Sequence, residues 1–200
     1  MASRHARMPL SKSQFLWIAT AFEGGLVLIA YALGYWVSID PLAALRLDVT
    51  AAFWGVLGSL LLFGLFIVSE RMEAARRIRE FLIDKMGGLL AGCSSLELLY
   101  LGFLAGITEE ILFRGVLQPW LERDWGWAGG LVFSNLIFAL VHWITPSYAL
   151  LAGLCGLFLG LMLDIGPERN LLAPILTHAI YDFLAFKVVV QAWRERQATT

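Results

Sequence analysis

The sequence predicts an all-α fold, a polytopic transmembrane helical bundle with about six membrane crossings. Apolar residues make up 59% of the 200 residues and charged residues only 16%, and the mean hydropathy is +0.73. The apolar residues gather into runs of about 17 to 25 residues, the length that crosses a hydrocarbon core of about 30 Å. A soluble helical protein would instead show polar stripes, since one face of each helix meets water.

Each predicted crossing is an apolar segment bounded by charged residues, Gly or Pro. The first run, from Phe15 to Trp36, is too long for a signal peptide and lacks a small-residue cleavage site. We therefore interpret it as an uncleaved anchor helix. The six predicted crossings are residues 15–37, 50–69, 95–118, 125–144, 147–164 and 171–193.

The segment between the second and third crossings differs from the rest. Residues 70–85 carry charges of both signs, together with apolar residues at helical spacing at Ile78, Phe81, Leu82 and Met86. This pattern fits an amphipathic helix that lies along the anionic inner leaflet. A solvated connecting helix explains it equally well.

The distribution of basic residues predicts the orientation. If the N-terminus is inside, the outer segments hold only Arg46, Arg123 and Arg169. The inner segments hold Arg4, Arg7, Lys12, Arg71, Arg76, Arg77, Arg79, Lys85, Arg194 and Arg196. The positive-inside rule then places both termini in the cytoplasm, with the protein in the cell (inner) membrane.

Charge and cysteine content exclude several function classes. The net charge of -1 offers no broad basic surface, so we expect no nucleic-acid partner. Cys93 and Cys155 lie in apolar surroundings without C-x-x-C spacing. This argues against a disulfide framework, a thiol-ligated zinc or a redox pair.

The third predicted crossing contains a cluster of ionisable residues: Glu109, Glu110 and Arg114. Ionisable groups within a membrane cost about 2.5–3.5 kcal/mol each on insertion scales, so their presence indicates a function. Glu110 and Arg114 are four residues apart and can pair on one helix face. Glu109 points about 100° away, free to face a cavity as a general base. The alternative is a structural ion pair with a spare acid.

Two of the three histidines also lie in apolar runs. His5 is in the polar N-terminal tail, whereas His142 and His178 are in predicted crossings, and Asp182 follows His178 by one helical turn. A lone membrane histidine is usually a packing or interhelical hydrogen-bonding residue. Two histidines together with Asp182 and an acidic helix favour a common site.

Helix geometry predicts which of these residues meet. A hairpin turning at residues 124–126 brings Glu109 level with His142, because each lies about 16 residues, or about 25 Å, from that turn. His178 falls near the outer end of the last crossing and fits less well. Either residues 166–174 enter the interior as irregular backbone, or the fifth crossing is shorter than drawn.

These residues form three ordered motifs that resemble a known family. The motifs are E-E-x-x-x-R from Glu109 to Arg114, F-x-x-x-H from Phe138 to His142, and H-x-x-x-N/D from His178 to Asp182. The chain resembles the CPBP family, also called Abi or CAAX-protease-like, whose eukaryotic members include the type II CAAX prenyl protease. The resemblance covers roughly residues 95–190 and implies an intramembrane protease, a hydrolase of peptide bonds.

The resemblance also implies roles for the individual residues. Glu109 with His142 would activate a water, while His178 and Asp182 would stabilise the oxyanion and Glu110 and Arg114 would support the site. Asp182 stands where the prenyl protease has Asn, and an ionised carboxylate cannot donate a hydrogen bond. It could orient His178, stay protonated or bind a metal.

We expect a glutamate mechanism that needs no cofactor, since H-E-x-x-H spacing is missing. Zinc is the alternative. Its ligands would be Glu109, His142, His178 and Asp182. The predicted organisation is one integral membrane domain, in which N-terminal anchor helices and an amphipathic linker (1–94) precede a CAAX-protease-like catalytic core (95–193).

The predicted function is an intramembrane endopeptidase acting on a membrane-associated protein or peptide. Two other functions stay open: an ion- or proton-coupled transporter, because intramembrane acids and histidines also mark ion pathways, and a catalytically silent scaffold or immunity protein. Glu23 and Glu97 match no motif, and we interpret both as near-interface or interhelical contacts. The sequence predicts no oligomeric state.

Overall fold

A computed structural model describes residues 10–199, so Arg4, His5 and Arg7 lie outside the described residues. Every secondary-structure element within residues 10–199 is helical, which confirms the all-α prediction. The elements are α1 (Lys12–Val37), α2 (Val49–Ser69), α3 (Glu73–Ala91), α4 (Ser95–Leu112), the π-helix η1 (Phe113–Leu117), α5 (Gln118–Val141), α6 (Pro146–Met162) and α7 (Leu172–Thr199).

Three helices, α1, α2 and α7, are long and apolar enough to cross a membrane, with 26, 21 and 28 residues. Helix α6 is apolar but has only 17 residues. Helix α4 carries acids at its end, and α5 includes the charged hairpin. The chain is therefore an integral membrane protein in which three of the six predicted crossings have the length and composition of a span.

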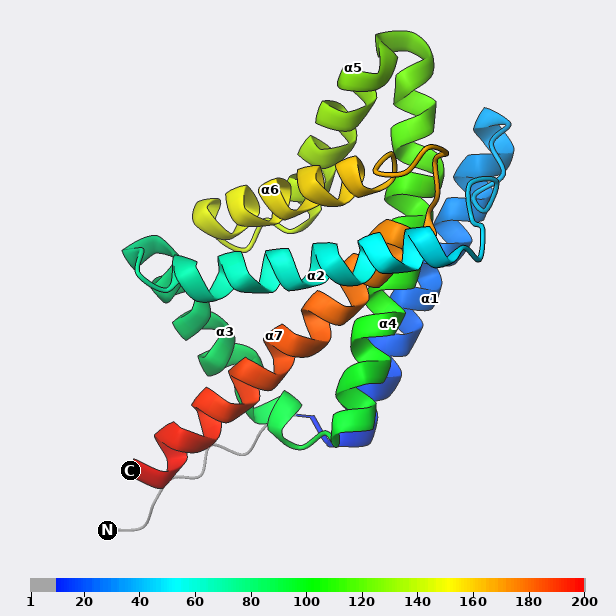
Figure 1. Ribbon diagram of the computed structural model, residues 1–200. Coiled ribbons are helices and arrows are strands. Elements are labelled where there is room, and N and C mark those ends of the chain that lie inside the picture. The colour runs from blue at the N-terminus through cyan, green and yellow to red at the C-terminus, as the bar shows by residue number, and fades with distance from the viewer. Residues whose placement is uncertain (1–9, 200) are drawn as a thin grey trace.

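The predicted hairpin between the third and fourth crossings is present. Helices α4, η1 and the first part of α5 follow one another without a break, and the chain then reverses at Gly126 (Figure 1). The φ of Gly126 is 67° and its ψ is 176°, inside the residues assigned to α5. Because only glycine adopts such a φ at low cost, Gly126 sets the position of the turn.

Helix α7 lies between α4, α2 and α3 and packs against all three (Figure 1). Its approach to α4 depends on Gly102 and Gly106. A Cβ at Gly102 would lie 2.6 Å from the carbonyl oxygen of Ala179, and one at Gly106 would lie 2.8 Å from the amide nitrogen of Ala179. Small residues four apart allow such close backbone contact in membranes. This contact fixes the end of α4 beside the first half of α7.

The two acids outside the motifs make the contacts predicted for them. Glu23 of α1 accepts a hydrogen bond from the Thr108 hydroxyl of α4, an interhelical contact one residue before Glu109. Glu97 lies in the first turn of α4, where one carboxylate oxygen is 3.0 Å from Nζ of Lys12. Both acids therefore hold α1 against α4.

The segment between α6 and α7 is irregular backbone whose last two residues, Asn170 and Leu171, enter the interior. Leu171 is fully buried, and its N–H donates to the carbonyl of Ala44 at 2.9 Å. The side-chain oxygen of Asn170 accepts from the Arg46 amide at 3.2 Å. Helix α6 also ends two residues before the predicted crossing does. The fifth crossing is thus shorter than drawn, the irregular backbone enters the interior only at its end, and His178 lies in the second turn of α7.

Candidate active site

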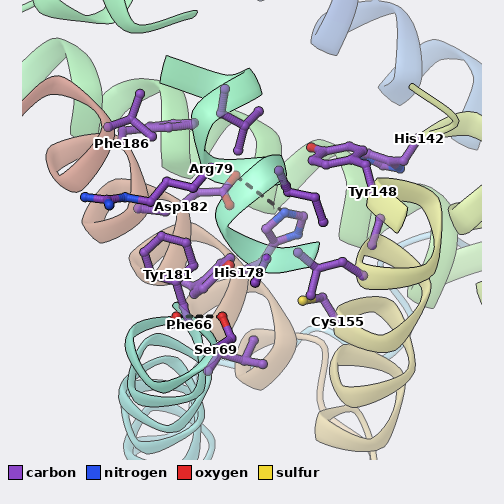
Figure 2. A pocket seen from close by; sticks show the side chains of 18 of the residues that line it. Phe66, Ser69, Arg79, His142, Tyr148, Cys155, His178, Tyr181, Asp182 and Phe186 are labelled. Atoms are coloured by element: carbon purple, nitrogen blue, oxygen red, sulfur yellow. Dashed lines mark hydrogen bonds and ion pairs between the residues drawn. The ribbon is translucent and has the colours of Figure 1, made fainter. Parts of the chain in front are cut away.

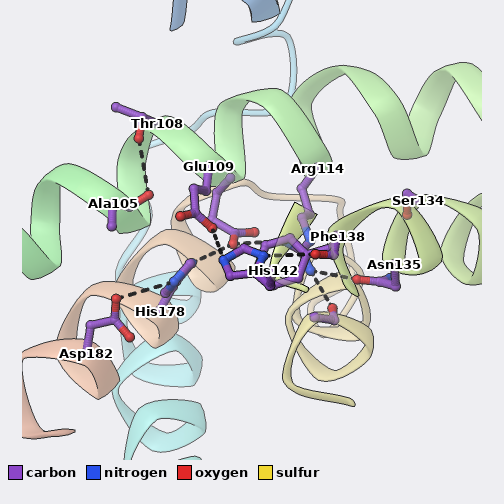
Figure 3. A network of polar contacts seen from close by, with 12 residues as sticks. Ala105, Thr108, Glu109, Arg114, Ser134, Asn135, Phe138, His142, His178 and Asp182 are labelled. Carbon is purple, nitrogen blue, oxygen red and sulfur yellow. Dashed lines mark hydrogen bonds and ion pairs between the residues drawn. The ribbon is translucent and has the colours of Figure 1, made fainter. Parts of the chain in front are cut away.

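The structure brings all six predicted site residues together from separate helices. Figure 3 shows Glu109, Arg114, His142, His178 and Asp182 in this arrangement. Glu109 and Glu110 come from the last turn of α4, and Arg114 comes from η1. His142 caps the end of α5, and His178 and Asp182 lie one turn apart on α7. Two groups form, one around Glu110 and one around Glu109.

The Glu110 group is a buried ion pair joined to a histidine. Nη1 of Arg114 donates to Oε1 of Glu110 at 2.9 Å, and Nδ1 of His178 lies 2.9 Å from the same oxygen. Since Arg114 can only donate, Oε1 is an acceptor, and Nδ1 of His178 carries the hydrogen. The side chains of Glu110 and Arg114 are 0% and 1% exposed. Such a desolvated charge-assisted pair holds its partners in one geometry.

Arg114 also ties the hairpin and α6 to this group. Its Nη2 donates to Oδ1 of Asn135 on α5 at 2.9 Å and to the carbonyl of Gly156 on α6. The guanidinium carbon lies 5.0 Å from the centre of the Phe138 ring, within the range of a cation–π interaction. The π-helical turn that carries Arg114 is a feature often found at functional sites.

The Glu109 group has a different hydrogen-bonding pattern. Nδ1 of His142 lies 2.8 Å from the Phe138 carbonyl, and the two rings stack with centroids 4.3 Å apart. Because a carbonyl only accepts, Nδ1 is the protonated nitrogen and Nε2 is left to face Glu109. Nε2 and Oε2 of Glu109 are 3.7 Å apart, too far for a direct hydrogen bond but close enough for one water to bridge them.

The second nitrogen of His178 faces Asp182. Its Nε2 lies 3.6 Å from Oδ2 of Asp182, so the imidazole stands between this carboxylate and that of Glu110. A ring flanked by two carboxylates can hold a second proton, which makes its Nε2–H a donor. Asp182 therefore lies where it can orient His178 or stabilise its charge.

A cavity of about 280 Å³ adjoins these groups. Glu109, His142, His178 and Asp182 line it, whereas Glu110 and Arg114 do not. Figure 2 shows three of these residues around the same space as Tyr148 and Cys155. The rest of the wall is largely apolar and comes mostly from α2, α3, α6 and α7. Four of the six predicted site residues thus face the cavity, and the Glu110–Arg114 ion pair lies behind them.

The residues proposed as zinc ligands are not grouped as a metal centre in this structure. Nδ1 of His178 is bonded to Glu110, which lies outside the proposed ligand set, and Nε2 of His142 lies 3.7 Å from Oε2 of Glu109. Between residues 10 and 199, no group of three or more His, Cys, Asp or Glu side chains is placed to hold a metal ion. The arrangement suits hydrogen bonding and proton transfer among the side chains themselves.

Sequence reasoning missed Asn135 and Gly156, the two partners that fix Arg114. A Cβ at Gly156 would lie 2.6 Å from Oδ1 of Asn135 and 3.3 Å from Nη2 of Arg114, so only glycine leaves room for this contact. Asn135 had a detectable signal, because a polar side chain in an apolar helix usually has an interhelical partner. Gly156, among many glycines, had none.

Comparison with known proteins gives one match. Residues 91–184 match the sequence model of the Rce1-like family, described as type II CAAX prenyl endopeptidase Rce1-like. No curated protein and no solved structure matches the chain. The matched segment contains all three motifs and all six site residues. The match over residues 91–184, just under half of the chain, therefore confirms the resemblance to the CAAX-protease-like family.

Proposed function

We propose that this protein is an intramembrane endopeptidase that hydrolyses a peptide bond with a water activated by Glu109 and His142. The observation that carries this proposal is the pair formed by Oε2 of Glu109 and Nε2 of His142, 3.7 Å apart on the cavity wall. Oε2 of Glu109 is buried and has no hydrogen-bond partner among the described residues. Both atoms are acceptors that a single water could satisfy.

In the first step the water attacks the substrate carbonyl. Glu109 takes one proton from the water, and the oxygen of the water forms a bond to the carbonyl carbon. The π electrons of the carbonyl move onto its oxygen, which becomes an oxyanion. His142 holds the water by accepting its other hydrogen at Nε2, an orientation that the Nδ1 bond to Phe138 supports.

In the second step the tetrahedral intermediate collapses. The carbonyl re-forms, the carbon–nitrogen bond breaks, and protonated Glu109 returns its proton to the leaving nitrogen. His178 would stabilise the oxyanion through Nε2–H, which Asp182 faces at 3.6 Å. Glu110 and Arg114 would not touch the substrate, since they do not line the cavity. Their role would be to hold His178.

The substrate we propose is a membrane-associated protein or peptide. A cavity with largely apolar walls inside an apolar bundle favours a segment delivered from the lipid. We further propose that both termini face the cytoplasm of the cell membrane. Lys12, Arg194 and Arg196 gather at one end of the bundle through contacts with α4 and α3, in keeping with the positive-inside rule.

The test uses the purified protein reconstituted in vesicles with an internally quenched peptide that ends in a prenylated CAAX sequence, and with the same peptide lacking the prenyl group. Glu109→Gln and His142→Ala should abolish cleavage of whichever probe the native protein cleaves. Glu23→Gln is the matched control, because it alters a membrane-embedded acid away from the cavity. Native turnover in both site variants would refute the proposal. Glu109-dependent proton or ion flux without cleavage would favour a transporter.

A further inference from the structure

The mechanism above leaves several polar side chains of the cavity unused, among them that of Tyr148. This residue lies in the first turn of α6, and its backbone N–H is capped by the Thr145 side chain at 3.1 Å. Its side chain lines the same cavity as Glu109, His142, His178 and Asp182 (Figure 2). Its hydroxyl makes no hydrogen bond within residues 10–199, so the hydrogen is available to a ligand.

An oxyanion in this cavity needs donors, and most of the other polar groups cannot supply one. The hydroxyl of Ser69 already donates to the Phe66 carbonyl at 2.7 Å. Arg79, which pairs with Glu70, extends its guanidinium to the side of the cavity away from His142 and Tyr148 (Figure 2). The protonated nitrogen of His142 is bonded to a backbone carbonyl. An ionised Asp182 only accepts. Apart from His178, the uncommitted O–H groups on the cavity wall belong to Tyr148 and Tyr181.

The two tyrosines differ in position. Tyr148 follows His142 by six residues, across a turn closed by a bond from the Ile144 N–H to the His142 carbonyl at 2.8 Å. It therefore stands on the side of the cavity where Glu109 and His142 would hold the water. The Tyr181 ring packs edge-on against Phe66 of α2, with centroids 6.4 Å apart, which directs it to the other side.

We propose that Tyr148 is a catalytic residue whose hydroxyl donates a hydrogen bond to the oxyanion of the tetrahedral intermediate. This inference rests on the proposed peptidase function. The hydroxyl keeps its proton throughout: the interaction strengthens as negative charge develops on the carbonyl oxygen and weakens again when the carbonyl re-forms. With Nε2–H of His178, it would form a two-donor oxyanion hole in which a tyrosine supplies the donor that Asp182 lacks.

The test compares Tyr148→Phe with Tyr181→Phe, a matched loss of one phenolic hydroxyl from the same cavity. Native protein, both variants and Glu109→Gln are reconstituted in vesicles with the quenched CAAX peptides described above. Tyr148→Phe should lower kcat about 100-fold, as loss of one oxyanion donor does, with KM changed by less than about twofold. Tyr181→Phe should keep native kcat.

A second measurement uses a peptide aldehyde with the same sequence, whose hydrate resembles the tetrahedral intermediate. Its inhibition constant should rise in Tyr148→Phe in proportion to the loss of kcat/KM, as expected for an intermediate analogue. A native kcat in Tyr148→Phe, or an equal loss of kcat in Tyr181→Phe, would overturn the inference. The peptidase proposal would still stand in that case if cleavage depended on Glu109. If the native protein cleaves neither peptide, or Glu109→Gln cleaves as well as native, both proposals fail.

Discussion

Oε1 of Glu110 accepts a hydrogen bond from Nδ1 of His178 at 2.9 Å, although the two residues are 68 positions apart. This bond joins the end of α4 to α7. The same oxygen of Glu110 also accepts a hydrogen bond from Nη1 of Arg114. The adjacent residue, Glu109, faces the cavity instead. Two adjacent glutamates thus have different surroundings: Oε1 of Glu110 accepts hydrogen bonds from two donors, whereas Oε2 of Glu109 is buried on the cavity wall without a partner among the described residues.

Replacing Glu110 should therefore mainly lower stability, whereas replacing Glu109 should mainly remove activity. Glu110→Ala leaves the Arg114 guanidinium buried without its carboxylate, which should lower the free energy of unfolding by about 3–5 kcal/mol. Glu109→Gln should change stability little and remove activity. Denaturant unfolding in detergent micelles, alongside peptide cleavage, separates the two. Equal loss of stability in both variants would contradict this division.

Asn135 and Gly156 should also support the site through Arg114. Asn135→Ala removes a hydrogen bond to a charged donor, a loss of about 1.5–3 kcal/mol. Gly156→Ala places a Cβ 2.6 Å from Oδ1 of Asn135 and should be comparably destabilising. Gly64→Ala is the control, because a Cβ there meets no atom within 4 Å. If Gly156→Ala unfolds at the native denaturant concentration, the close approach of α5 and α6 is not required.

Much of the fold could be predicted from the sequence, because bilayer thickness sets the length of an apolar helix directly. The ends of α1 and α2 fall close to those predicted, and the hairpin turns at Gly126 as expected. The π-helix η1 could not be predicted. It carries Arg114, whose partners lie 21 and 42 residues further along the chain, and no local pattern indicates them.

For the site, residue types and spacing predicted which side chains gather, but they did not predict every contact among these side chains. Four-residue spacing indicated the Glu110–Arg114 pair, and the hairpin registry indicated Glu109 beside His142. The bond between Glu110 and His178 was not foreseeable, since it depends on the approach of α4 to α7 at Gly102 and Gly106. Tyr148 belongs to no motif, and only the folded cavity shows its position.

The close approach of α4 to α7 gives a further prediction. Gly106→Val should push α4 away from α7, because a Cβ would lie 2.8 Å from a backbone nitrogen that cannot move aside. Both stability and cleavage should fall, since the shift separates Glu110 from His178. Overpacking of this kind costs about 1–3 kcal/mol. Gly64→Val, at an open position, should leave cleavage within about twofold of native, and equal activity in the two variants would argue against a tight α4–α7 contact.

Metal removal should leave the activity unchanged. The described residues do not form a set of three or more metal-binding side chains, and the proposed steps need only Glu109, histidines and water. Protein that is treated with a zinc chelator, and from which the chelator is then removed, should cleave the peptide at the native rate. Metal content is measured on the same samples. Activity that disappears with the chelator and returns only with added zinc would require a rearranged site that binds the metal.

Asp182→Asn tests what the carboxylate contributes next to His178. Asparagine keeps an oxygen near Nε2, where Asp182 Oδ2 now lies at 3.6 Å, and adds two N–H donors for the oxyanion. We expect kcat within about threefold of native, a barrier change of about 0.7 kcal/mol or less. Asp182→Ala removes both the acceptor and any donor, so its kcat should fall at least about tenfold, or about 1.4 kcal/mol. If Asp182→Asn loses as much activity as Asp182→Ala, the negative charge itself is required, and Asp182 would act by holding a second proton on His178.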